Sequence, residues 1–306
     1  MRNPVVGEFE ADDLKKQVQK VLKGLGNPKP PLDLLQVREL LKLDVKYYST
    51  TEDSFLQETV SKVRIAGKQL LKRPSLLIDV IKKAKLSGLW IPDQKRILLD
   101  KDTPKLKHRW IESHEIGHHL APWHQRYLFG DDRESLGYGC HDKLESEANF
   151  VAGQLLFLQD RFKQEGDDNE PSIRAVQSLS KTFGNTLTST LWRFVEECHP
   201  DKLLVGIVSQ HPHKPNSEFD ALAPMKHLIE SPKFKLQFHT LDILKLFAEI
   251  QSYCSRAKAG PLGTKIIVLR DINGDRHEFR FESFHNGYEC LTLGVYLRKS
   301  GLHFLD

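Results

Sequence analysis

The chain has 306 residues, of which 39% are hydrophobic and 28% are charged, an ordinary balance for a soluble globular protein. No stretch approaches the roughly 20 uncharged apolar residues that a helix needs to cross a bilayer, so we expect no membrane-spanning segment. The net charge of +4 is too small to indicate nucleic-acid binding. Acidic residues lie where a signal peptide would carry its apolar segment, so we expect a cytoplasmic protein.

Cysteine chemistry is not indicated. The four cysteines, Cys140, Cys198, Cys254 and Cys290, lie far apart and form no Cys-x-x-Cys pair. This spacing fits reduced, buried thiols better than a disulfide framework or a zinc ribbon.

Hydrophobic periodicity predicts helices and one strand in the first 85 residues. Apolar residues recur three and four positions apart over 12–25 and 32–43, which is typical of helices with one buried face. A segment rich in Gly and Pro separates these two helices. Alternation and aromatic residues over 45–48 predict a strand, and helical spacing returns over 55–85.

The middle of the chain predicts a hairpin and two further helices. Residues 89–91 and 96–99 have the composition of two short strands joined by a turn. Residues 105–120 predict a helix that ends before the following proline. A glycine-rich, charged loop is expected over 129–140, and then a helix over about 142–162, with its first residue as the cap.

The remaining residues combine helices and strands. An acidic, mobile loop is expected over 165–171, followed by two helices over 172–198 that break near a Gly-Asn pair. A β-branched run at 203–208 predicts a strand, and a linker is expected to begin at 212–215. A helix and three strands with Asn-Gly turns between them are then predicted at 240–257, 265–270, 277–281 and 291–296.

The sequence His-Glu-Ile-Gly-His at 114–118 falls in the helix predicted over 105–120. A helix turns about 100° per residue, so His114 and His118 lie on one face, where both imidazoles can bind one tetrahedral zinc ion. Glu115 then lies beside the metal, where a carboxylate can accept a proton from an activated water during attack on a carbonyl. We expect two zinc ligands and a general base here; a polar helix face with solvated histidines is the alternative.

A catalytic zinc ion needs a third protein ligand. In the next predicted helix, Glu145 and Asn149 share one face at a spacing of four residues. This spacing lets Glu145 bind zinc while Asn149 hydrogen-bonds a ligating histidine. The alternative for Glu145 is a surface carboxylate early in a helix. Glu147 points to a different face, and whether it replaces Glu145 as the third ligand is left open.

Three more side chains are candidates for stabilising the negative oxygen that forms during carbonyl attack: Tyr138, His124 and His141. The alternative for each is an ordinary loop residue. His119 is rotated about 100° from its neighbour, and we interpret it as structural or solvent-facing. The helices over 172–195 carry few basic residues, so helical packing is expected there rather than DNA binding.

Two segments together, HEIGHHL at 114–120 and ESEANFVAGQLL at 145–156, resemble the ImmA/IrrE family of zinc metallopeptidases. In that family a His-Glu-x-x-His helix is followed by a helix of the type Glu-x-x-Ala-Asn-x-Phe-Ala. The resemblance covers about 32–156 and extends more weakly over 172–194. The chain departs from the family pattern at Val151 and Gly153, and residues beyond about 212 match nothing in it.

The resemblance implies a gluzincin arrangement with one Zn²⁺ per chain. His114, His118 and Glu145 would be the ligands, Glu115 the general base and Asn149 the supporting residue. Family members act as endopeptidases, and several are implicated in removing a DNA-binding repressor in mobile elements or stress-response systems. By analogy, the expected partner is a protein substrate, with a repressor as one candidate.

We therefore expect an α+β fold: a mostly helical, zincin-like metallopeptidase domain with a small sheet, followed by helices and a small mixed C-terminal unit with β-hairpins. The expected function is a zinc-dependent endopeptidase. The alternative is a non-catalytic, metal-binding regulatory or sensor protein that keeps the same fold. The expected division is an N-terminal helix and linker, the metallopeptidase domain, a helix-turn-helix-like extension and a C-terminal unit, at 1–30, 31–165, 166–211 and 212–306.

Overall fold

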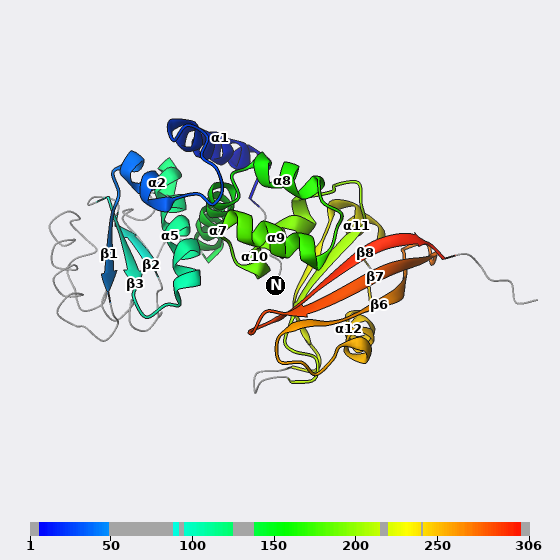
Figure 1. Ribbon diagram of the computed structural model, residues 1–306. Coiled ribbons are helices and arrows are strands. Elements are labelled where there is room, and N and C mark those ends of the chain that lie inside the picture. Colours follow the sequence, from blue (N-terminus) through cyan, green and yellow to red (C-terminus); the bar gives the residue numbers. More distant parts are fainter. Residues whose placement is uncertain are drawn as a thin grey trace, which may run out of the picture. The chain divides into compact units, whose positions relative to one another are not determined.

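The computed structural model describes residues 6–48, 88–91, 95–124, 138–214, 220–239 and 241–300, with the backbone alone at 88, 89, 105, 106 and 138–141. The chain divides into two compact units, Met1–Gln159 and Asp160–Asp306. The expected segments 1–30 and 31–165 thus fall almost entirely in the first unit, and 166–211 and 212–306 in the second. Each unit combines helices with one sheet, so the fold is α+β (Figure 1).

Within these described ranges, no helix has both the length and the apolar character needed to span a bilayer. The helical pattern predicted over 55–85 lies outside the described residues. The same holds for most of the loop expected over 129–140.

The first unit begins with two helices and then builds a small sheet. Its elements agree with the helices predicted at 12–25, 32–43 and 105–120 and with the strand predicted at 45–48. In chain order they are α1 (Glu8–Gly24), α2 (Leu34–Leu41), β1 (Asp44–Tyr48), β2 (Gly88–Ile91), β3 (Arg96–Asp100), α5 (Lys105–Leu120) and α7 (Tyr138–Leu156).

The three-stranded sheet has the order β1-β3-β2, with β1 parallel to β3 and β2 antiparallel to it. The antiparallel β2–β3 pair confirms the predicted hairpin. The central strand β3 buries Ile97, Leu98 and Leu99, whereas β2 forms one edge. Helix α5 packs against β2 and β3, so the His-Glu-Ile-Gly-His sequence lies next to this edge of the sheet.

Helices α1, α2 and α7 pack around α5 to complete the first unit. Leu14 and Val18 of α1 are fully buried, as are Val151 and Leu155 of α7, because apolar residues recur at helical spacing on these faces.

The helix predicted over 142–162 has different bounds in the structure. Helix α7 begins at Tyr138, so Asp142 is not its cap, and it ends at Leu156. Leu158 and Gln159 then adopt φ values of 55° and 52°, in the left-handed region where a right-handed helix cannot continue. A new helix, α8 (Asp160–Asp167), follows and occupies the first part of the loop expected over 165–171.

The second unit is a five-stranded antiparallel sheet with helices on both faces. The predicted helices and strands are present, whereas β5 and α11 were not predicted. After α8 the elements are α9 (Ile173–Phe183), α10 (Leu187–Glu197), β4 (Leu204–Ser209), β5 (Met225–Glu230), α11 (Pro232–Gln237), α12 (Ile243–Tyr253), β6 (Gly260–Arg270), β7 (Arg276–His285) and β8 (Cys290–Lys299). The sheet order is β5-β4-β8-β7-β6.

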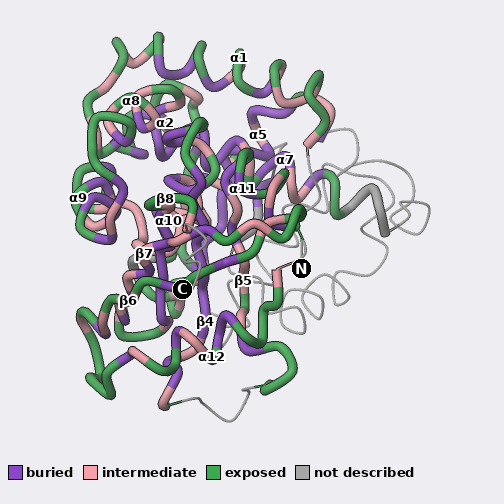
Figure 2. The backbone as a smooth tube through the Cα atoms, turned by 90° about the vertical axis from the view of Figure 1, so that its right-hand side faces the viewer, coloured by how far each residue is buried: buried purple, intermediate pink, exposed green. Residues whose placement is uncertain are grey.

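Each face of this sheet has its own packing layer. On one face Phe234 of α11 and Phe238, which follows the helix, pack against Phe279 of β7. On the other face Gly206 of β4 lies so close to Val195 of α10 that an added Cβ would be 3.1 Å from the valine side chain. Strand β4 is consequently buried along its whole length (Figure 2).

Candidate metal centre

The centre lies between α5 and α7, which pack closely because of one glycine. A Cβ added to Gly117 would lie 2.6 Å from the backbone oxygen of Ala148, closer than any side chain tolerates. With hydrogen at this position, the two helix backbones approach each other directly. This approach brings Glu145 of α7 to the face of α5 that carries His114 and His118.

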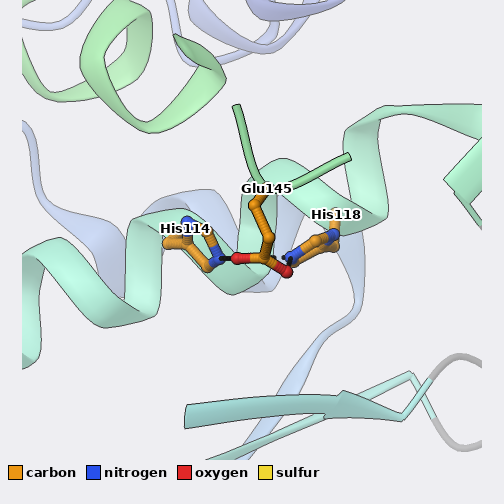
Figure 3. A group of neighbouring side chains, drawn as sticks. All are labelled: His114, His118 and Glu145. Atoms are coloured by element: carbon orange, nitrogen blue, oxygen red, sulfur yellow. Dashed lines mark hydrogen bonds and ion pairs between the residues drawn. The ribbon is translucent and has the colours of Figure 1, made fainter. Parts of the chain in front are cut away.

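The three predicted ligand side chains converge on one point, as Figure 3 shows. His114 Nε2 lies 3.1 Å from His118 Nε2 and 3.1 Å from Glu145 Oε2. His118 Nε2 lies 3.6 Å from Glu145 Oε1. Donor atoms bound tetrahedrally to one zinc ion at roughly 2.0–2.1 Å lie roughly 3.3 Å from one another. The spacing of the three side chains therefore fits one such ion.

The hydrogen-bonding partners of the histidines also fit a metal ion. Asn149 Oδ1 lies 3.0 Å from His114 Nδ1, and because this oxygen can only accept, the Nδ1–H donates and leaves the Nε2 lone pair directed at the centre. With neutral imidazoles, the converging atoms of His114, His118 and Glu145 are all acceptors. A point surrounded by three acceptors favours a cation, and the two-nitrogen, one-carboxylate donor set is one that zinc accepts.

Electrostatics at the centre favour positive charge in the same way. Burial acts to lower the pKa of His114, but the hydrogen bond to Glu145 and the charge of Glu115 raise it above its usual value. Burial acts to raise the pKa of Glu145, but hydrogen bonds with His114 and His118, which form when protons rather than a metal ion lie between these groups, hold it well below its usual range. Glu145 is therefore ionised and available as a ligand.

Glu115 is the buried carboxylate of the centre, with 7% of its surface exposed. Burial raises its pKa, although the charges of His118 and His114 and a hydrogen bond from the backbone N–H of Trp90 act against this rise. Trp90 belongs to the edge strand β2, so Glu115 lies between the ligand face of α5 and the edge of the sheet. A carboxylate with a raised pKa is a stronger base than one in water.

A second set of side chains lies behind His118 and was not foreseen as a set from the sequence. His118 Nδ1 lies 2.9 Å from His124 Nδ1, and His124 Nε2 lies 2.8 Å from Glu147 Oε2. The indole Nε1–H of Trp123 donates to the same carboxylate oxygen, at 2.5 Å. His124 and Glu147 are fully buried, and burial lowers the pKa of His124 to about 4.

These contacts show where the other candidate side chains lie. Glu147 is engaged by His124 and Trp123, so it is Glu145 rather than Glu147 that meets the two histidines. His124 contacts the Nδ1 side of His118, away from the converging Nε2 atoms. The side chains of Tyr138 and His141 lie outside the described residues.

His119, interpreted as structural or solvent-facing, is half-buried beside Trp90, with ring centroids 5.4 Å apart. Among the residues that the structure describes, a second group also has metal-ligating chemistry: Asp271 and Asp275 in the β6–β7 turn and His277 near the start of β7. Asp271 already accepts backbone hydrogen bonds within that turn and pairs with His277, while Asp275 pairs with Lys299. These hydrogen bonds and ion pairs explain why the three side chains lie close together without a metal ion.

No protein-family model matches the chain, and no curated protein matches its sequence. Among solved structures, a Mycobacterium tuberculosis transcriptional regulator is similar to it, with a TM-score of 0.51 and 10% sequence identity over 94% of this chain and 76% of that chain. At this identity the similarity concerns the fold alone: the α+β arrangement of this chain also occurs in a solved protein.

Proposed function

We propose that the chain is a zinc-dependent endopeptidase of the ImmA/IrrE type, with a zincin-like first unit and a glutamate as third ligand. One observation carries the proposal: three acceptor side chains, His114, His118 and Glu145, converge at the spacing of zinc ligands. A buried carboxylate of raised pKa, Glu115, lies beside them. A structural zinc site is usually closed by four protein ligands, whereas a catalytic one has three.

In this proposal, the chain's own residues divide the work of peptide hydrolysis. His114, His118 and Glu145 would hold the metal, and Asn149 would keep the His114 ring in its ligating tautomer. Bound zinc supplies Lewis-acid activation of water and of the substrate carbonyl. Glu115 takes a proton from the attacking water and delivers it to the leaving amine, as a general base and then a general acid.

The test has two parts, metal content and turnover. Purified protein should carry one zinc ion per chain by elemental analysis, and His114→Ala should lose it. Protein substrates should then be cleaved by the wild type and left intact by Glu115→Gln, which keeps the shape of the side chain and removes its basicity. Candidate DNA-binding repressors are the first substrates to try, by the resemblance to the ImmA/IrrE family.

A matched control for Glu115→Gln is available on the same helix. Glu112 is a buried carboxylate that pairs with Arg38 of α2 at 2.8 Å, and Glu112→Gln should leave cleavage unchanged. Equal cleavage by wild type and Glu115→Gln would overturn the catalytic assignment.

A second candidate is a metal-binding regulator that catalyses no reaction. We propose the cytoplasm as the location for either candidate. The fold similarity of nearly the whole chain to a protein named a transcriptional regulator favours it. The two candidates differ at Glu115, since a binding protein has no need of a general base beside the metal. A regulator would keep its metal and its partner binding in Glu115→Gln and would release no peptide products in either form.

A further inference from the structure

Resting on the proposed zinc site, we propose that His124 and Glu147 are positioning residues: they form a buried hydrogen-bond chain that fixes the ring orientation and the tautomer of the ligand His118. Neither the metal-binding motif nor the resemblance to a family assigns a role to this chain of contacts. It runs from Trp123 and Glu147 through His124 to His118, with successive distances of 2.5, 2.8 and 2.9 Å.

The end groups set the direction of this chain. The indole of Trp123 can only donate a hydrogen bond, so the Glu147 oxygen that it contacts is an acceptor. The same Glu147 oxygen, in a carboxylate whose other oxygen lies 3.8 Å from Lys143 Nζ, accepts from His124 Nε2, which places the His124 proton on Nε2 and leaves its Nδ1 as an acceptor. His118 Nδ1 must therefore carry the donating proton.

The position of this proton determines which nitrogen of His118 can bind a metal ion. A neutral imidazole carries one N–H, so a proton on His118 Nδ1 leaves the lone pair on Nε2, the atom that faces His114 and Glu145. The carboxylate at the far end also increases the electron density of the imidazoles, which strengthens His118 as a ligand. Asn149 does the same for His114 with one contact, so both histidine ligands are held in the ligating tautomer.

Burial makes the arrangement rigid. His124 and Glu147 have no exposed surface, and His118 has 7%. A carboxylate buried to this degree is costly unless it is paired, and replacing it leaves its partners unsatisfied in a low-dielectric interior. Glu147 also lies two residues from the ligand Glu145 on α7, so one helix supplies both a ligand and the support for a ligand on α5.

The experiment measures metal affinity directly. Wild type, Glu147→Gln and His124→Phe are stripped of metal, and their Zn²⁺ affinity is determined by competition with a chromophoric chelator. We expect Glu147→Gln to weaken Zn²⁺ binding about tenfold to hundredfold, the range seen when support of a ligating histidine is removed. The absorption bands of bound Co²⁺ should also shift, because they report ligand geometry. Glu147→Gln preserves side-chain shape and serves where His124→Phe does not fold.

The control is Glu112→Gln, a buried carboxylate on the same helix as His118 that contacts Arg38 and not the chain to Glu147. A merely structural role for Glu147 predicts similar losses of thermal stability in both variants and unchanged Zn²⁺ affinity and Co²⁺ spectra in each. That result would overturn the proposal.

The proposed peptidase function is tested separately, by measuring cleavage of protein substrates. A wild type that binds Zn²⁺ and hydrolyses no protein would overturn the peptidase function and leave the positioning role standing. Unchanged affinity in Glu147→Gln and His124→Phe would overturn the positioning role and leave the function standing. A wild type that binds no Zn²⁺ would overturn both.

Discussion

Gly117 of α5 lies directly against the backbone of Ala148 of α7, and a Cβ at position 117 would be 2.6 Å from the Ala148 oxygen. Ala148 is itself fully buried, with only a methyl group to pack. These two small residues set the distance between the helices, and Glu145 lies one helical turn from the contact. Gly117 is thus part of the geometry that brings Glu145, the proposed third ligand, to the two histidines.

Gly117→Ala should push α7 away from α5. We expect it to reduce the free energy of Zn²⁺ binding more than it reduces the free energy of unfolding. The added methyl group meets backbone rather than a flexible side-chain tip, so overpacking is expected to cost about 1–3 kcal/mol in the free energy of unfolding. Urea unfolding of the apoprotein measures this cost, and chelator competition measures the affinity.

A second helical glycine provides the comparison. Gly24 of α1 would place its Cβ 3.0 Å from the tip of the Leu40 side chain, which can move. Gly24→Ala should be neutral or stabilising by up to about 1 kcal/mol, since alanine favours helix. If Gly117→Ala behaves like Gly24→Ala in both measurements, the close approach of the helices has no role in metal binding.

Removing the support of His114 gives a second prediction. Asn149→Ala deletes the oxygen that accepts from His114 Nδ1, and Zn²⁺ affinity should fall about tenfold or more. Asn149→Asp replaces the amide by a carboxylate that still accepts this hydrogen bond, so it should bind Zn²⁺ within a few-fold of wild type. Equal loss in both variants would show that the hydrogen bond to the ring is not what Asn149 contributes.

Local geometry predicts which face of each helix carries His114, His118 and Glu145; that the two helices meet was expected because a catalytic zinc ion needs a third ligand and because the two segments resemble the ImmA/IrrE family. Helical periodicity places the two histidines on one face, and the spacing of Glu145 and Asn149 on the next helix suits one ligand and one supporting residue. The structure brings these four side chains together.

The hydrogen-bond chain from Glu147 through His124 to His118 could not be predicted from the sequence in the same way. Glu147 lies 200° around the helix from Glu145, and periodicity indicates only that it faces elsewhere. That it meets Trp123 and His124 depends on how the segment after α5 packs against α7, which is a tertiary relationship. The position at which α7 ends was not predicted either. Leu158 and Gln159 adopt the left-handed backbone conformation after this helix, and neither is a residue type that usually indicates it.

Metal binding should protect one part of the chain from hydrogen exchange. A ligand that binds only the native state stabilises it by about 2.7 kcal/mol at a hundredfold excess over its Kd. Because the proposed ligands belong to α5 and α7, peptides from these helices should exchange more slowly with Zn²⁺ than with a chelator. Peptides from β6, β7 and β8 are the internal control. Slowing spread evenly over both units would contradict a site confined to the first.

The thiol of Cys198 should be inert in the native protein. Burial, with smaller contributions from Asp167 and Glu197, raises the pKa of Cys198 to about 12, so almost no thiolate forms at pH 8. Iodoacetamide should label Cys198 only after unfolding, which peptide mapping by mass spectrometry detects. Raising the pH from 7 to 9 should not produce native-state labelling. Rapid labelling at pH 8 would show that the thiol is accessible and ionised.

The second unit should be destabilised by removal of one aromatic ring without loss of metal binding by the first. Phe279 is fully buried, with ring centroids 5.3 Å from Phe238 and 5.7 Å from Phe234. Phe279→Ala removes the ring that these two contact and should cost about 3–5 kcal/mol in the free energy of unfolding.

Tyr288, 86% exposed in the turn between β7 and β8, is the matched aromatic control, and Tyr288→Ala should change stability by less than about 0.5 kcal/mol. Each unit has its own sheet and core, so the first unit should fold and bind Zn²⁺ in Phe279→Ala with wild-type affinity. Urea unfolding followed by hydrogen exchange resolves the two units, and chelator competition gives the affinity. A parallel loss of Zn²⁺ binding would show that the first unit depends on the second for its structure.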